Sequence, residues 1–151
     1  MYLFQQGTPF IYQGQEIGME NNDNWTMEEI DDCSTHGEYQ RCLEVGYSEE
    51  KALEIVSHYS RDNARTPFQW DDTANAGFTS GTPWLVVNEK YKRINAAEQM
   101  SRENSVFSYY KRLIALRKDP EYAETIVYGR TEPALVEEKD VMAYFRRGEG
   151  Q

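Results

Sequence analysis

The feature that most constrains the fold is a short apolar run, Phe-Ile-Tyr at residues 10–12, with no obvious partner run nearby. A Gly-Thr-Pro turn precedes it at 7–9 and Gln-Gly follows it at 13–14. Such a run between turn signals is typical of a buried strand in a parallel sheet, and that strand needs hydrogen-bonded neighbours. The sequence therefore predicts one strand of a sheet whose other strands are not close by, and hence an incomplete fold.

Helical patterns account for much of the remaining chain. The clearest runs from Ser105 to about Lys118, because apolar residues recur there at helical spacing, basic residues crowd the second half and Pro120 ends it. Ser48 precedes two glutamates and predicts the start of a second helix over 49–56. Shorter helices are expected at 26–32, 38–43 and 95–98, the first and last from capping-box spacing.

Extended structure is expected in three places after Pro120, at residues 125–129, 134–136 and 141–146. A brief extended run is also expected at 84–87, after a turn-rich loop. Strands paired only with each other leave an open edge. The last part of the chain is therefore predicted to begin a β-rich unit.

Charge and cysteine content exclude several classes of function. The 26 acidic and 16 basic residues give a net charge of −10, whereas nucleic acids and anionic membranes attract basic surfaces. No apolar run approaches the length of a membrane span. Cys33, His36 and Cys42 lack a fourth ligand at zinc spacing, which argues against a metal site. The expected setting is the cytoplasm, with reduced thiols.

Residues 60–71 form an arginine-rich stretch between two helical patterns. Arg61 and Arg65 lie beside Asp62, and Trp70 follows a Thr-Pro step that stops a helix. A guanidinium is a planar fork of donors that fits carboxylates and neighbouring sugar hydroxyls. Two interpretations stay open on these residues alone, a binding loop and a purely structural network of ion pairs.

Four blocks resemble one enzyme family closely. They are GTPFIYQGQEIGM at 7–19, the stretch 60–71 with its RDNARTP and QWD elements, GFTSGTPW with the residues that follow at 77–95, and SVFSYYKRLIALRK at 105–118. These blocks resemble the oligo-1,6-glucosidase and α-glucosidase branch of the α-amylase superfamily, glycoside hydrolase family 13. The resemblance extends over nearly the whole chain.

The resemblance implies an α/β fold that is one part of a larger enzyme. Residues 1–120 would be the last strand–helix unit of a (β/α)8 barrel, with strand 8, a long loop containing short helices, and helix 8. Residues 121–151 would begin an all-β, sandwich-like C-terminal domain. The family's two catalytic carboxylic acids and a third, stabilising Asp precede strand 8. The chain is therefore expected to contain no catalytic residue, to be inactive alone and to need the preceding barrel portion.

The site residues implied by the resemblance are few. Arg61 matches the family arginine that grips hydroxyls of the terminal glucose in the −1 subsite. Ser34 lies where relatives often carry a Glu that touches the leaving-group sugar. Glu16, Asp62 and Arg65 would support the site. In addition, Gln15 replaces a Glu found in many relatives, and Trp70 is expected in the core.

The implied parent is a retaining, exo-acting α-glucosidase that hydrolyses α-1,6 or other α-glucosidic bonds in short oligosaccharides, without a cofactor. Within this class, a trehalose-6-phosphate hydrolase and a sucrose-acting glucosidase are alternatives. Two further alternatives are a non-catalytic carbohydrate-binding or interaction module and a truncated gene product. The expected partner is a small oligosaccharide, bound through the parent enzyme, and neither nucleic acid nor membrane.

Overall fold

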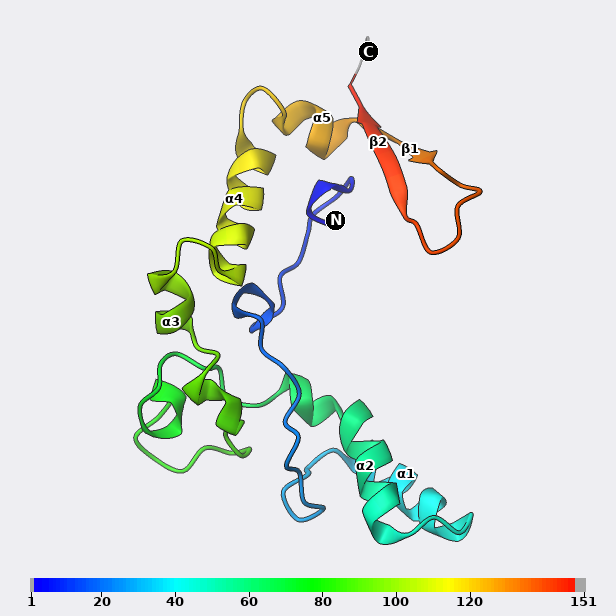
Figure 1. Cartoon of the computed structure of the whole chain (residues 1–151), viewed down its shortest axis with the longest axis vertical. Helices are drawn as coiled ribbons and strands as arrows, with labels where there is room; N and C mark the ends of the chain where they lie inside the picture. The colour runs from blue at the N-terminus through cyan, green and yellow to red at the C-terminus, as the bar shows by residue number, and fades with distance from the viewer. Residues whose placement is uncertain (1, 149–151) are drawn as a thin grey trace.

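The computed structural model describes residues 2–148, which form a curved body with α1 and α2 side by side at one end and a β-hairpin at the other (Figure 1). The described elements are α1 (Cys33–Glu44), α2 (Glu49–Tyr59), α3 (Ala96–Ser101), α4 (Val106–Lys118), α5 (Ala123–Tyr128), β1 (Arg130–Ala134) and β2 (Ala143–Arg147). Single turns of 3-10 helix, η1 (Tyr2–Phe4), η2 (Gln15–Ile17), η3 (Arg61–Ala64), η4 (Ala74–Gly77) and η5 (Glu89–Lys92), interrupt the loops.

Side-chain caps start the helices where local sequence signals predicted them. The Ser48 side chain accepts the N–H of Lys51 at the start of α2, and Ser105 accepts that of Ser108 at the start of α4. Asn95 caps α3 by accepting the N–H of Glu98 at 2.8 Å. Each cap satisfies a backbone donor that the first helical turn leaves unpaired. The helices expected at 49–56, 95–98 and 105–118 are thus confirmed.

The loop before α1 departs from the prediction. Residues 26–32 form only a turn, although Glu29 does accept hydrogen bonds from the Thr26 N–H and hydroxyl. A helix cannot continue there because the N–H groups of Asp31 and Asp32 are bonded to the side chain of Asp62. The helix expected at 38–43 is confirmed as part of a longer one, since α1 starts at Cys33.

Two expected extended segments do not form strands. At residues 10–12 the Phe10 side chain is 85% exposed, and the Tyr12 N–H donates to the side chain of Gln15. A strand needs a neighbouring backbone, and among the described residues none is paired with this run. Residues 84–87 are bends and irregular loop, held by the buried side chain of Leu85.

The expected strand at 125–129 is wrong, because residues 125–128 belong to helix α5 and Gly129 caps its end. The Asp119 carbonyl accepts the Ala123 N–H at 2.7 Å and restarts a helix just after Pro120. The hairpin then pairs β1 with β2 in antiparallel register, with Arg130 opposite Arg147 and Ala134 opposite Ala143. The strand expected at 141–146 is therefore confirmed as β2, whereas that at 134–136 ends at Ala134. The division at residue 120 stays a prediction, and 149–151 lie outside the described part.

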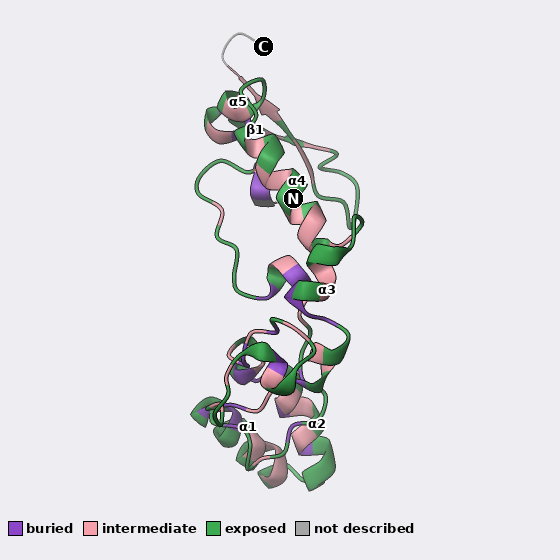
Figure 2. Cartoon of the chain, turned by 90° about the vertical axis from the view of Figure 1, so that its left-hand side faces the viewer, coloured by how far each residue is buried: buried purple, intermediate pink, exposed green. Residues whose placement is uncertain are grey.

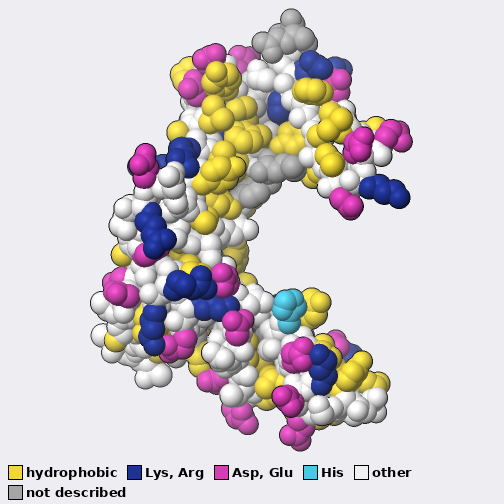
Figure 3. All heavy atoms as spheres, in the orientation of Figure 1, with side chains coloured by type: hydrophobic (Ala, Val, Ile, Leu, Met, Phe, Trp, Pro, Cys, Tyr) yellow, Lys and Arg dark blue, Asp and Glu magenta, His cyan; other side chains and the backbone are white. Residues whose placement is uncertain are grey.

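Buried residues gather around α2, η3 and the neighbouring loops, and α4 has none (Figure 2). The apolar stripe of α4, which includes Phe107, Leu113 and Ile114, is half-buried, and no α4 residue is fully buried. Figure 3 shows apolar side chains exposed along the concave face beside α4. The described chain therefore leaves much of its apolar surface uncovered.

Arg117 fastens the first residues of the chain to α4. Its guanidinium donates to the carbonyl oxygens of Leu3 at 2.6 Å, Gln5 at 3.2 Å and Gly7 at 2.5 Å. Since one cation satisfies three carbonyls, Arg117→Ala is expected to weaken this attachment by about 1–3 kcal/mol. The measurement is the rate of limited proteolysis within residues 3–9, which should rise.

Lys118→Ala is the matched control, because Lys118 is exposed at the same helix end and its side chain makes no hydrogen bond or ion pair within residues 2–148. It should leave the proteolysis rate unchanged. Equal rates for both variants would contradict the role assigned to Arg117.

Candidate functional site

The candidate site forms where the start of α1 meets the end of α2. Asp32 caps α1, and its Oδ2 accepts the hydroxyl of Thr35 at 2.9 Å. Ser60 follows α2 and caps η3 by accepting the N–H of Asp62. The hydroxyl oxygens of Thr35 and Ser60 lie 3.1 Å apart and share a hydrogen bond, so the two helix ends are joined through their caps. This junction places Arg61 next to Asp32.

Arg61 is held from one side and open on the other. Its Nε and Nη2 donate to Asp32 Oδ1 at 3.0 and 2.5 Å, and Nη2 also donates to Ser34 Oγ at 2.9 Å. The Arg61 side chain remains 57% exposed, whereas that of Asp32 is 4% exposed. Within the described chain Nη1 makes no hydrogen bond. The arrangement therefore offers an oriented cation whose free donors face solvent.

Asp62 is the fully buried centre of the junction. Its Oδ2 accepts the backbone N–H groups of Asp31 at 2.8 Å and Asp32 at 2.9 Å, and its Oδ1 accepts Arg65 Nη1 at 3.1 Å. Its side chain is 0% exposed. Arg65 also approaches Asp32 Oδ1 at 3.8 Å. Asp62 thus fixes the backbone that carries Asp32, and Asp32 in turn fixes Arg61.

The charge balance of this junction favours ionised Asp32. The hydrogen bond from Arg61, aided by those from Thr35, lowers the pKa of Asp32 from 3.8 to about 2, against the opposing effect of burial. Because the folded-state pKa is the lower one, this stabilisation is complete above pH 3.8 and is lost as the pH falls towards about 2. Arg61 therefore keeps its charged partner throughout the neutral range.

A cavity of about 400 Å³ lies between α1 and α2 with Arg61 at its edge. Ser34, Glu38 and Arg61 supply polar groups, and Ile55, Val56 and Tyr59 supply an apolar wall. An apolar pocket with a few oriented polar groups is the usual form of a small-molecule site. This cavity is the best-formed candidate because it contains the oriented arginine.

The other predicted site residues divide between this junction and the rest of the molecule. Ser34 and Arg65 belong to the junction through their contacts with Arg61 and Asp62. Glu16 lies on η2, contributes none of these bonds, and has a buried Oε2 without a partner in the described part. The expectation that Trp70 is core is wrong, because its side chain is 54% exposed, with its ring tilted against that of Phe68 at 4.6 Å between centroids.

Sequence reasoning missed two residues of the junction. Asp32 was not among the predicted residues, although an Asp three positions before Thr35 is a helix-cap signal that could have indicated it. Asn63 was also missed. Its Oδ1 accepts the indole N–H of Trp25 at 2.8 Å and the N–H of Asn22 at 3.1 Å, and its amide donates to two carbonyls near the end of α2. No local pattern indicates these long-range contacts.

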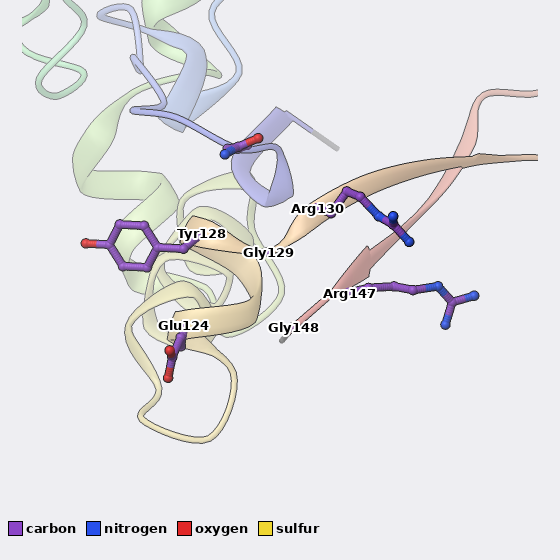
Figure 4. A pocket seen from close by; sticks show the side chains of 7 residues that line it. Glu124, Tyr128, Gly129, Arg130, Arg147 and Gly148 are labelled. Carbon is purple, nitrogen blue, oxygen red and sulfur yellow. The ribbon is translucent and has the colours of Figure 1, made fainter. Parts of the chain in front are cut away.

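A second cavity, of about 470 Å³, lies between α5 and the hairpin, but its charged groups do not converge. Figure 4 shows Arg130 and Arg147 extending to the opposite side from Glu124 and Tyr128. Arg147 is already paired with Glu132 at 2.6 Å. This cavity therefore lacks the oriented, available polar group that marks the first one.

Comparison with known proteins agrees with the sequence blocks and the fold. Residues 1–129 match the family model described as alpha amylase, catalytic domain. The chain belongs to the alpha-amylase family. It is 46% identical over 142 residues to the oligo-1,6-glucosidase of Parageobacillus thermoglucosidasius, covering 93% of this chain and 25% of that protein.

Two solved structures superpose on nearly the whole chain. Trehalose-6-phosphate hydrolase of Bacillus licheniformis is 40% identical with a TM-score of 0.87, covering 97% of this chain and 26% of its own. The isomaltulose synthase SmuA of Protaminobacter rubrum is 43% identical with a TM-score of 0.84, at the same coverage. The chain thus spans about a quarter of the relatives it matches. Among the described helices, none is long and apolar enough to span a membrane.

Proposed function

We propose that this chain supplies the substrate-gripping arginine, Arg61, of a retaining, exo-acting α-glucosidase. The supporting observation is the half-exposed guanidinium, fixed on a buried carboxylate at the edge of a 400 Å³ cavity. Its free donors would bond hydroxyls of the terminal sugar in the −1 subsite, and its orientation would be set before the substrate arrives. Ser34, on the same guanidinium, would face the leaving-group sugar.

Catalysis would come from elsewhere in the parent enzyme. Retaining glycosidases need two carboxyl groups about 5–5.5 Å apart, one as nucleophile and one as acid and base. Here Asp32 and Asp62 are both occupied by arginines, so we assign them to support. The isolated chain is proposed to be inactive. The apolar stripe of α4, which is only half-buried, supports its packing against a preceding barrel portion, with residues 1–120 completing the barrel and 121–151 beginning a β domain.

The proposed substrates are short α-glucosides. The oligo-1,6-glucosidase names of several relatives support α-1,6 bonds. The trehalose-6-phosphate hydrolase and isomaltulose synthase among the solved relatives support two alternatives, a phosphorylated disaccharide and sucrose. The small, neutral Ser34 beside Arg61 would leave room for different leaving groups, and so the linkage is best decided by direct assay.

A chimera tests this proposal. The chain replaces the matching quarter of the Parageobacillus oligo-1,6-glucosidase, and hydrolysis of nitrophenyl α-glucoside, isomaltose, sucrose and trehalose 6-phosphate is measured. We expect a folded chimera to release glucose with retained anomeric configuration together with the leaving group, which is glucose 6-phosphate when the substrate is trehalose 6-phosphate. The separate chain should release none.

Two results would contradict the proposal. Turnover by the isolated chain would show that it carries its own catalytic carboxylates. A chimera that folds with the thermal stability of its parent but hydrolyses none of the four substrates would show that this chain does not complete a working substrate site.

A further inference from the structure

A third cavity, of about 510 Å³, lies beside the loop that connects η4 and η5, and none of its lining residues belongs to the Arg61 junction. Its wall includes Trp84, whose side chain is 72% exposed. The rim carries Asn24, Glu29, Thr82 and Glu89. The cavity thus combines one large exposed aromatic surface with several polar side chains.

The loop holds Trp84 in place from both sides. Before it, Asn75 Nδ2 donates to the carbonyl oxygens of Thr79 at 3.1 Å and Gly81 at 2.9 Å. After it, the side chain of Leu85 is 3% exposed and anchors the loop inward. Further on, buried Asn88 donates to the Glu20 carbonyl at 2.9 Å. A pinned loop presents the indole without the entropic cost of ordering it on binding.

The rim has unused hydrogen-bonding capacity. Glu29 uses Oε2 to bond Thr26, which leaves its Oε1 unbonded within residues 2–148. In the same described range, the side-chain amide of Asn24 and the indole N–H of Trp84 have no hydrogen-bond partner. An amide, an indole N–H and carboxylate oxygens around an aromatic face can bond a ring of hydroxyls while the face covers C–H groups.

The charges on the lining select against anions. Glu29 and Glu89 are the charged lining residues of this cavity, and no Lys or Arg is among the described residues that line it, although Glu89 is paired at 2.5 Å with Lys92, which does not line the cavity. Phosphates and nucleic acid need cations or helix N-termini. A purely apolar ligand would leave the rim groups unpaired. A neutral ligand with many hydroxyl groups can both cover the indole face and bond the polar side chains of the rim.

We propose that the Trp84 cavity binds a neutral oligosaccharide, with a sugar ring stacked on the indole and hydroxyls bonded to Asn24 and Glu29. The volume lies within the range of about 300–1,000 Å³ common for small-ligand sites. This inference uses only the Trp84 cavity and does not depend on the role proposed for Arg61.

Nuclear magnetic resonance on the whole 151-residue chain tests the proposal, because its three tryptophans give three separate indole N–H signals. Isomaltotriose and maltotriose are the probes. We expect the Trp84 signal to shift saturably with at least one of them, while the signals of buried Trp25 and of Trp70 stay in place. Trp84→Ala should weaken binding by about tenfold or more, followed on the backbone amides of Asn24 and Glu89.

Two matched variants sharpen the test. Trp70→Ala removes another half-exposed indole outside the cavity and should leave the affinity unchanged. Arg61→Ala should also leave it unchanged, which separates this site from the Arg61 junction. Unmoved indole signals with both sugars would overturn the proposal. So would binding that Arg61→Ala abolishes and Trp84→Ala preserves, since the sugar would then lie at the junction.

Discussion

Asp62→Ala is expected to lower the free energy of unfolding of the chain by about 3–5 kcal/mol, the range for removing one partner of a buried charged pair. The carboxylate of Asp62 is 0% exposed and accepts two backbone N–H groups in addition to Arg65. Its removal leaves the Asp31 and Asp32 N–H donors and a cation without their acceptor. Urea unfolding followed by circular dichroism measures the loss.

Asp62→Asn should have a smaller effect in the same experiment, about 1–3 kcal/mol. The amide oxygen can still accept the two N–H groups, but the amide nitrogen must then face Arg65. Asp72→Ala is the matched control, because Asp72 is exposed and has no side-chain partner among the described residues. Equal unfolding midpoints for Asp62→Ala and Asp72→Ala would mean that the loop before α1 is held by other contacts.

The helices were predictable where the signal was local. The caps Ser48, Asn95 and Ser105 each bond a backbone N–H only three residues away, so short sequence windows contain the whole interaction. The apolar spacing of α4 extends over three turns and indicates a helix without any tertiary information. These local features were enough to predict α2, α3 and α4 from the sequence.

The errors arose in short apolar runs, which fit either a strand or a helix. Residues 10–12 and 126–128 have three such residues each, too few to distinguish a period of two from one of 3.6. Tertiary context decided both cases. The first run has no strand beside it among the described residues, and the second belongs to helix α5, whose first N–H bonds to the Asp119 carbonyl. The local pattern of apolar residues indicates neither the missing neighbouring strand nor the preceding helical turn.

The site was predictable in part, through a motif more than through geometry. Arg61, Asp62 and Arg65 stand out as a cluster in the sequence, and the structure does bring Arg61 and Ser34 into contact. Asp32 did not stand out, because its partner Arg61 is 29 residues away along the chain. Asp32 comes to support Arg61 only in the folded chain, where the caps of α1 and η3 are joined.

Arg61→Ala in the active chimera is expected to lower kcat/KM by about 2–4 kcal/mol equivalent, or roughly 30- to 1,000-fold, the size of a lost pair of charged hydrogen bonds. Arg61→Lys should lose nearly as much. An ammonium is a point donor that cannot bond Asp32 along one edge and sugar hydroxyls along another. Arg93→Lys, an exposed arginine paired with Glu20, is the control and should leave kcat/KM unchanged.

Asp32→Asn separates a positioning role from a merely structural one. If Asp32 orients Arg61 for the substrate, this variant should lower kcat/KM by about tenfold or more while the chimera keeps its fold, because the arginine loses its fixed charge partner. Combined with Arg61→Ala, it should add little further loss, since two residues acting as one unit are not additive. Fully additive losses, or an Arg61→Ala variant as active as its parent, would contradict this role. The Arg61–Asp32 pair would then only stabilise the contact between α1 and η3, and the substrate would bind elsewhere.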